Sequence, residues 1–149
     1  MNARDIMIRQ AHTIPPHCTI GEALRQMANL RLQAFPVVDD KKMLLGTLNF
    51  WQILEWAMPS YISQGDLSDV RFAPDLAQFH ERLEELKLDP VTQVMNPHPP
   101  CVRPDDSVLA CGALIMKTPK TVYLLPVVEG DHQLVGIISA WDVIKEIAG

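Results

Sequence analysis

The sequence contains an internal repeat, and this repeat limits the folds open to the chain more than any other feature. Residues 44–54 and 134–144 share an apolar segment with a central glycine, then a polar residue, then an apolar helical run. Gly46 and Gly136 lie 90 positions apart, as do Trp51 and Trp141. Similarity at a fixed offset predicts two copies of one supersecondary unit.

The repeat extends towards the N-terminal side of both segments. Residues 35–39 match residues 125–129 at the same offset of 90, whereas residues 5–7 match residues 93–95 at an offset of 88. The second copy therefore has two extra residues, which fall around positions 118–121. Such a length change is typical of a connecting loop.

Each copy predicts an extended segment, a helix, a hairpin and a second helix. Prolines keep the first segment extended, and Thr19 with Glu22 forms a capping box for the first helix. Asn49 and Ser139 are placed to cap the final helix of each copy. The fold class is therefore α/β, with two βαββα repeats packed sheet to sheet about a pseudo-two-fold axis.

A third region separates the two copies. We divide the chain into a first repeat at 1–58, an inserted linker at 59–90 and a second repeat at 91–149, which together form one globular pair. The insert carries one amphipathic helix, predicted from Pro74–Asp75 to Leu88. We expect this helix to serve packing rather than function.

The ordered motifs of each copy resemble those of a known family. A methionine, a Val/Ile-x-Pro segment, a helix led by Thr or Ser, a Pro-Val-Val strand and a Gly-hydrophobic-x-Ser/Thr-x-x-Asp end follow in that order. This set resembles the CBS domain, and its two occurrences resemble a tandem CBS pair, or Bateman module. The resemblance covers the chain except for residues 57–90. It implies that two modules stack into a flat dimer.

Composition narrows the range of functions. Net charge is −5 and Lys and Arg do not cluster, which disfavours nucleic-acid binding. No apolar run is long enough to span a bilayer, and we expect a cytoplasmic protein. Cys18, Cys101 and Cys111 are odd in number and lack Cys-x-x-Cys spacing, so we expect reduced, at least partly buried thiols.

Ser139 and Asp142 are the main candidate site residues, and two interpretations remain open for them. In the first, Ser139 caps the last helix and Asp142 interacts with the positive end of its dipole. In the second, Asp142 holds ribose hydroxyls, a role that acidic residues commonly take. The first copy has Asn49 and Gln52 instead, which can cap but supply no carboxylate, so we expect a degenerate first site.

The resemblance to CBS pairs implies a ligand for the second copy. Asp142 would hold the ribose of an adenosine nucleotide (AMP, ADP, ATP or an adenosyl relative), and Ser139 would contact ribose or phosphate. The adenine would pack on two segments of the same copy: Pro100, Cys101 and Val102, and Tyr123, Leu124, Leu125 and Pro126. Candidate phosphate partners are Lys117, Lys120 and Arg103 in the second copy, and Arg25 and Arg31 in the first; the alternative for each is an ordinary solvated surface charge. The nucleotide would be an effector, not an obligatory cofactor.

The sequence does not predict catalysis. The five histidines are dispersed, the glycines are isolated, and no nucleophile-elbow pattern occurs. His98, Cys101 and Cys111 match no usual metal-ligand spacing. We therefore expect neither an enzyme nor a metal site.

The helix predicted at 108–116 is apolar on all sides, which suggests that a second chain covers one face. We expect a homodimer through the apolar helices around Ala110, Ala113, Trp51 and Trp141. The leading hypothesis is a regulatory module that binds an adenosine-containing ligand and signals to a separate, unknown effector protein. The alternative is a dimerisation or scaffold module without a ligand. Stabilisation by nucleotide that depends on Asp142 would distinguish the two.

Overall fold

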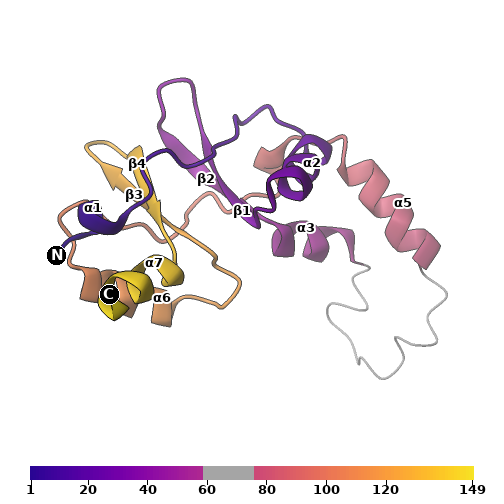
Figure 1. The fold of residues 1–149 in the computed structure, drawn as a ribbon. Coiled ribbons are helices and arrows are strands. Elements are labelled where there is room, and N and C mark those ends of the chain that lie inside the picture. The colour runs from indigo at the N-terminus through magenta and orange to yellow at the C-terminus, as the bar shows by residue number, and fades with distance from the viewer. Residues whose placement is uncertain (59–75) are drawn as a thin grey trace.

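A computed structural model describes residues 1–58 and 76–149 (Figure 1). Each half of the molecule contains a two-stranded antiparallel hairpin flanked by helices, which confirms the α/β repeat fold. The elements of the first half and the insert are α1 (Ala3–Ile6), α2 (Ile20–Leu30), β1 (Ala34–Val38), β2 (Leu44–Asn49), α3 (Phe50–Ala57) and α5 (Leu76–Leu86). Those of the second half are η2 (Val91–Gln93), α6 (Val108–Lys117), β3 (Leu125–Glu129), β4 (Gln133–Ile138) and α7 (Ala140–Ala148).

The two hairpins have the same register and the same irregularity. Val37 pairs with Gly46 in β1–β2, and Val127 pairs with Gly136 in β3–β4. A shift of register follows directly, between Val37 and Val38 and between Val127 and Val128. The extended segment expected before each first helix adds one parallel bridge, from Ile14 to Val37 and from Val102 to Val127.

The first residues of each repeat pack on the other repeat. Helix α1 lies against the hairpin β3–β4 (Figure 1), and Ala3 is fully buried in the core of the second half. Val91 and Val94, which begin the second repeat in sequence, are buried in the core of the first half. The two halves therefore exchange their first segments, a feature that the sequence alone did not predict.

Two glycines permit this exchange because the incoming segment passes directly over them. A Cβ on Gly46 would meet the carbonyl oxygen of Asn96 at 2.5 Å, and a Cβ on Gly136 would meet the Met7 sulfur at 2.6 Å. Beside them, the backbones of Thr47 and Asn96 exchange two hydrogen bonds of 2.9 and 3.0 Å. Ile137 and Ile8 exchange an equivalent pair at the same distances.

The halves also meet at the ends of their hairpins. Val38, Leu44 and Val128 form a small buried cluster between the two sheets, with Cys101 and Leu134 packed against it. The Leu44 amide donates to the carbonyl of His132 at 3.0 Å, and the Leu134 amide donates to the carbonyl of Lys42 at 2.9 Å. These reciprocal contacts are those of two repeats related by a pseudo-two-fold axis.

The described part of the insert belongs to the first half. Phe79, Leu83 and Leu86 on α5 pack against the first core, and α5 contacts α3. The expected start of this helix at Pro74–Asp75 lies outside the described residues, and α5 ends at Leu86, two residues before the expected Leu88. Among the helices of the described ranges, none combines the length and apolar character needed to cross a membrane.

Candidate functional site

The second-copy cap joins Ser139 and Asp142 at the start of α7. Asp142 Oδ2 accepts from the Ser139 amide at 2.8 Å and from the Ser139 hydroxyl at 2.9 Å. The Asp142 amide donates to Ser139 Oγ at 3.4 Å, which completes the capping box. Asp142 is only 3% exposed, and its second oxygen, Oδ1, has no hydrogen-bond partner among residues 1–58 and 76–149. The cap is thus present, and the carboxylate retains one further acceptor.

Ser139 lies at the edge of a cavity of about 480 Å³, which we call the Ser139 cavity. Its walls come from both repeats. They are formed by Ile8, Gln10, Ala11, His12, Arg31, Leu32, Gln33, Ala34, Tyr123, Leu124, Ile137 and Ser139. The volume lies within the range of small-molecule sites, and the lining combines apolar side chains with a few polar groups, as such sites usually do.

A second cavity continues from the same serine along the start of α7. We call this space of about 330 Å³ the Trp141 cavity, and it shares Ser139, Tyr123 and Leu124 with the Ser139 cavity. Lys120 lines it beside Ala140 and Trp141, which form the first turn of α7. Unpaired amides and the helix dipole at such an end favour anions, so a phosphate could contact Lys120 and the helix end together.

The first-copy cap faces the equivalent cleft, which is smaller. Asn49 and Gln52 form the same capping box as the second-copy pair and line the Asn49 cavity of about 180 Å³. Asn49 Nδ2 also reaches across to the carbonyl of Thr121 at 3.1 Å. Trp51 Nε1 donates to the Tyr123 hydroxyl at 2.6 Å, and Phe50 stacks on the Tyr123 ring with centroids 5.5 Å apart. These contacts tie α3 to the segment on the opposite side of the cleft.

The segments expected to hold adenine beside Asp142 are divided between several places. Pro100 lines the Asn49 cavity, together with Tyr123 and Leu124. Cys101 packs at the interface between the sheets, and Val102 is buried and paired with Val127. Leu125 lines the Trp141 cavity, and Pro126 is fully buried in β3. Of the expected adenine residues, the structure brings Tyr123 and Leu124 to the Ser139 cavity.

The candidate phosphate partners also separate. Lys120 lies beside Ser139 on the Trp141 cavity, whereas Lys117 is exposed in the last turn of α6. The Arg103 guanidinium donates to the carbonyls of Val128 at 3.4 Å and Gly130 at 3.1 Å, so it supports the β3–β4 hairpin. Arg31 lines the Ser139 cavity, and Arg25 is exposed on α2.

Sequence reasoning missed the contribution of the first repeat to the second-copy site. Gln10, Ala11 and His12, and the four residues 31–34, face Ser139 across the halves. The offsets of 88 and 90 equate these segments with residues 98–100 and 121–124. This equivalence could have identified the segments as part of a cleft. It does not show whether a segment faces the Asn49 cap or the Ser139 cap.

The three thiols are free, as expected, and their pKa values indicate no reactive cysteine. Burial raises the pKa of the Cys18 thiol to about 11, helped by a hydrogen bond and negative charge from Glu22. Burial likewise raises the pKa values of Cys101 and Cys111. A thiolate is the nucleophilic form, so these side chains are suited to packing. No group of three or more His, Cys, Asp or Glu side chains within the described ranges could hold a metal ion.

Comparison with known proteins places this geometry in a family. CBSX2, a chloroplastic CBS domain-containing protein of Arabidopsis thaliana, is 26% identical over 141 residues, covering 90% of this chain and 57% of that protein. The inosine-5'-monophosphate dehydrogenase of Methanocaldococcus jannaschii is 26% identical over 143 residues, covering 96% of this chain and 23% of that protein. The chain thus spans a little over half of the plant relative and less than a quarter of the archaeal enzyme.

A solved structure agrees with the fold over nearly the whole chain. The crystal structure of CBSX2 in complex with AMP matches with a TM-score of 0.74 at 20% identity, covering 99% of this chain and 96% of that chain. The sequence pattern of the CBS domain matches residues 3–58 and again residues 91–149. The chain belongs to the CBS domain family and is a tandem CBS pair.

Proposed function

We propose that the chain is a regulatory module that binds an adenosine-containing nucleotide in the Ser139 cavity. The observation that carries this proposal is the position of Ser139. It lies at an open cavity of about 480 Å³ lined by both repeats, and it is hydrogen-bonded to a carboxylate that keeps a second oxygen without a partner among the described residues. AMP is bound in the CBSX2 structure of the same fold, which supports the ligand class.

Each part of the nucleotide has a matching part of the site. The ribose lies at Ser139, and Asp142 lies behind it, 3% exposed and outside the lining of both cavities. The ribose hydroxyls donate to Asp142 Oδ1 once the side chains around Ser139 shift, since Oδ2 already accepts two hydrogen bonds from Ser139. The adenine occupies the part of the cavity where the apolar Leu32 and Ala34 alternate with the Gln33 amide. The phosphate extends from Ser139 into the Trp141 cavity, towards Lys120 and the first turn of α7.

Regulation requires that the nucleotide bind two states of the protein with different affinities. Both clefts are lined by both repeats, so a ligand in either changes contacts between the halves. We assign the output to a separate effector protein. The role is binding rather than turnover.

The alternative is a scaffold that dimerises without a ligand, and one observation favours it. Helices α6 and α7, which pack side by side, leave large apolar side chains exposed: Leu109 at 80%, Met116 at 72%, Trp141 at 64%, Ile144 at 56% and Ile147 at 71%. Ala110 and Ala113 are exposed on the same α6, and Trp51 is exposed on α3. A patch of this kind marks an interaction surface, and we assign it to a homodimer.

Thermal melting with AMP, ADP, ATP or S-adenosylmethionine distinguishes the two functions. At 100 times its dissociation constant, a ligand adds about 2.7 kcal/mol to the free energy of unfolding, which is several degrees for a chain of this size. Asp142→Asn keeps the shape of the cap and removes its charge, so the ligand-induced shift should disappear. Gln52→Ala, the matched change in the first-copy cap, should keep the shift.

Two results would contradict the nucleotide proposal. No shift with any of the four compounds, in a folded protein that sediments as a dimer, would favour the scaffold. A full shift that persists in Asp142→Asn would place the ligand elsewhere in the molecule.

A further inference from the structure

A separate cavity of about 330 Å³ lies on β4, between the first segment of the chain and the β1–β2 turn. We call it the Arg9 cavity. Its floor is formed by Leu134, Val135 and Gly136, and its walls include Arg9, Thr13 and Lys42. It contains neither Ser139 nor any residue of α7. It is therefore distinct from the nucleotide site proposed above, although Gln10 and Ala11 line both cavities.

Backbone pairing fixes both walls of the Arg9 cavity on β4. Next to Arg9, Ile8 and Ile137 exchange two hydrogen bonds of 2.9 and 3.0 Å. On the other wall, the carbonyl of Lys42 accepts from the Leu134 amide at 2.9 Å. The two attachments flank Val135 and Gly136, so the two cationic residues are held on opposite sides of a short stretch of strand. Such a site is largely preorganised and loses little conformational freedom on binding.

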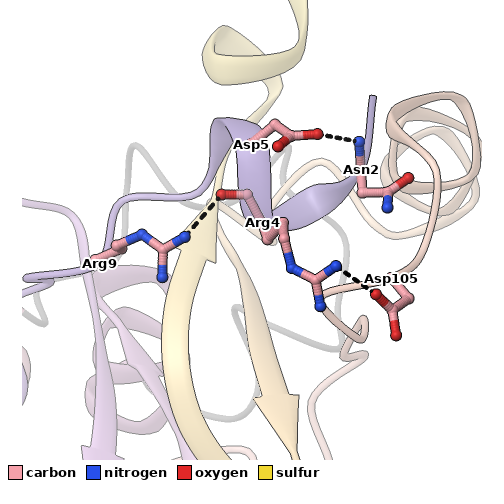
Figure 2. Close-up of polar contacts among 5 residues, drawn as sticks. All are labelled: Asn2, Arg4, Asp5, Arg9 and Asp105. Atoms are coloured by element: carbon pink, nitrogen blue, oxygen red, sulfur yellow. Dashed lines mark hydrogen bonds and ion pairs between the residues drawn. The ribbon is translucent and has the colours of Figure 1, made fainter.

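The Arg9 guanidinium forms no ion pair with a carboxylate among the described residues. Figure 2 shows that its guanidinium donates to the backbone carbonyl of Arg4, at 3.3 Å. The two carboxylates nearby are already bound elsewhere. Asp105 pairs with Arg4 at 2.6 Å, and Asp5 accepts from the Asn2 amide at 2.7 Å.

Lys42 likewise forms no ion pair within residues 1–58 and 76–149, where the ion pairs are Arg4–Asp105 and Lys87–Glu84. Two carboxylates occur in its own turn, Asp39 and Asp40. They line the neighbouring cavity, which Lys42 and Thr13 also line, but neither forms an ion pair with Lys42. Asp39 Oδ1 accepts from the amides of Lys41 and Met43, both at 2.9 Å, which holds that carboxylate in the turn.

The lining of the Arg9 cavity thus presents several hydrogen-bond donors, and its charged members are all positive. Arg9 and Lys42 are cations, Thr13 adds a hydroxyl and Gln10 adds an amide, and no Asp or Glu of residues 1–58 and 76–149 lines the cavity. The repeat relation places Pro97 opposite Arg9 and His132 opposite Lys42, so the second copy does not repeat the charge pair. Two cations that face one cavity without an ion pair among the described residues attract an anion to that cavity.

The geometry points to a phosphate-binding site in the Arg9 cavity. The planar guanidinium of Arg9 suits two phosphate oxygens at once, and the Lys42 ammonium adds a point charge from the other wall. The phosphate group can come from a small phosphorylated compound, or from the end of a nucleotide that passes Gln10 and Ala11 from the Ser139 cavity.

The test follows backbone amide signals of the intact protein by NMR while inorganic phosphate replaces chloride at constant ionic strength. Saturable shifts should appear at the amides of Arg9, Gln10, Lys42 and Gly136. The double variant Arg9→Gln, Lys42→Gln should raise the dissociation constant for phosphate at least tenfold. Both side chains are exposed, so the fold should be retained. Arg25→Gln, Lys145→Gln removes two exposed cations away from the cavity and should change the constant less than twofold.

Comparison of AMP with ATP then identifies the source of the phosphate. Weaker ATP binding with unchanged AMP binding in the Arg9, Lys42 variant shows that a nucleotide tail reaches the site. Unchanged binding of both nucleotides, with phosphate binding lost, shows an independent site for a phosphorylated compound. Absence of saturable phosphate shifts around the cavity, or equal affinity in the double variant, overturns the site. Because the first titration uses inorganic phosphate alone, its result does not depend on the nucleotide proposal.

Discussion

The two helix caps of the molecule use the same local geometry, yet the clefts they face differ. Asn49 and Ser139 each begin a helix and each form a capping box with the residue three positions later. Asn49 has a side-chain amide left over, which reaches the Thr121 carbonyl across the cleft, and Trp51 beside it binds Tyr123. The Ser139 hydroxyl donates to Asp142 instead. In the second cleft, Arg31 occupies the position equivalent to Thr121 in the first.

This difference supports the proposal that one copy of the repeated unit has a structural role and the other a binding role. The first cleft is bridged by side chains from its own helix and measures about 180 Å³, against about 480 Å³ for the second. One asparagine and one tryptophan therefore suffice to make the first cleft part of the packing between the halves. The second cleft keeps the larger cavity, and the Asp142 carboxylate holds Ser139 from outside the lining of that cavity.

The largest effect is expected from alanine substitutions at Gly46 and Gly136, where each half receives the first segment of the other. These two variants test whether both halves are packed equally tightly at that point. Gly46→Ala places a methyl group against a backbone carbonyl, whose displacement breaks the Thr47–Asn96 pairing. We expect a loss of about 2–3 kcal/mol in the free energy of unfolding, measured in urea. Gly136→Ala meets the flexible Met7 side chain instead and should cost about 1 kcal/mol.

Met7→Ala in the Gly136→Ala background supplies the control, because it removes the Met7 sulfur and Cγ, the two atoms that the new methyl group would meet most closely. The cost of the glycine change should be smaller there than in the wild-type background. Equal losses for the two glycine variants would mean that the backbone adjusts as easily as a side chain, and the proposed asymmetry would be wrong.

A smaller loss of stability should appear at high pH in the first repeat. The two repeats differ in the residue that precedes the cap of their first helix. Cys18 precedes Thr19, whereas Asp106 precedes Ser107. The pKa of the Cys18 thiol is about 11 in the folded protein against an ordinary value of 9.0, so the unfolded state ionises first. The stabilisation by the neutral thiol is complete below pH 9 and is lost as pH rises towards 11.

Cys18→Ala isolates the contribution of the thiol to the pH dependence of stability, because the other titrating groups affect both proteins equally. The stability difference between wild type and Cys18→Ala should narrow by roughly 2 kcal/mol between pH 8 and pH 10.5, as measured by denaturant unfolding. A difference that stays constant over this interval would show that the thiol is solvated in the folded protein.

The smallest effect is an expected absence of change. Gln52→Asp gives the first-copy cap the carboxylate of the second, but leaves Asn49 bonded to Thr121 and Trp51 bonded to Tyr123. The number of nucleotide molecules bound per chain, measured by titration calorimetry, should therefore match that of the wild-type protein. A second bound nucleotide would mean that the carboxylate alone decides which cleft binds.

Much of the fold was predictable because local patterns determine it. The offset of 90 residues predicted two related hairpins, and Thr19 with Glu22 predicted a capping box that the structure contains. Tyr123 and Leu124 were expected to contact adenine together with Leu125 and Pro126, but strand β3 begins at Leu125 and leaves the first two residues outside the sheet. Tyr123 and Leu124 instead line the clefts between the halves.

The composition of the candidate site was less predictable, for a physical reason. Residues 10–12 and 98–100 have equivalent places in the repeat. Their local sequence therefore does not show whether each segment packs on its own half of the molecule or on the other half. The decision depends on long-range contacts, such as Met7 over Gly136 and Asn96 over Gly46. The cap residues Ser139 and Asp142 were identified because their interaction spans only three positions.

The exchange of first segments also bears on the ancestry of the chain. A single repeat of this type would leave the groove over its own glycine empty and its own first segment without a hairpin to pack on. An ancestor with one repeat would thus have been complete only when two identical chains traded these segments. Joining two such genes end to end would have turned a partnership between chains into one within a chain. Such a joining would leave each half free to change its cleft independently, which is consistent with the difference between Asn49 and Ser139.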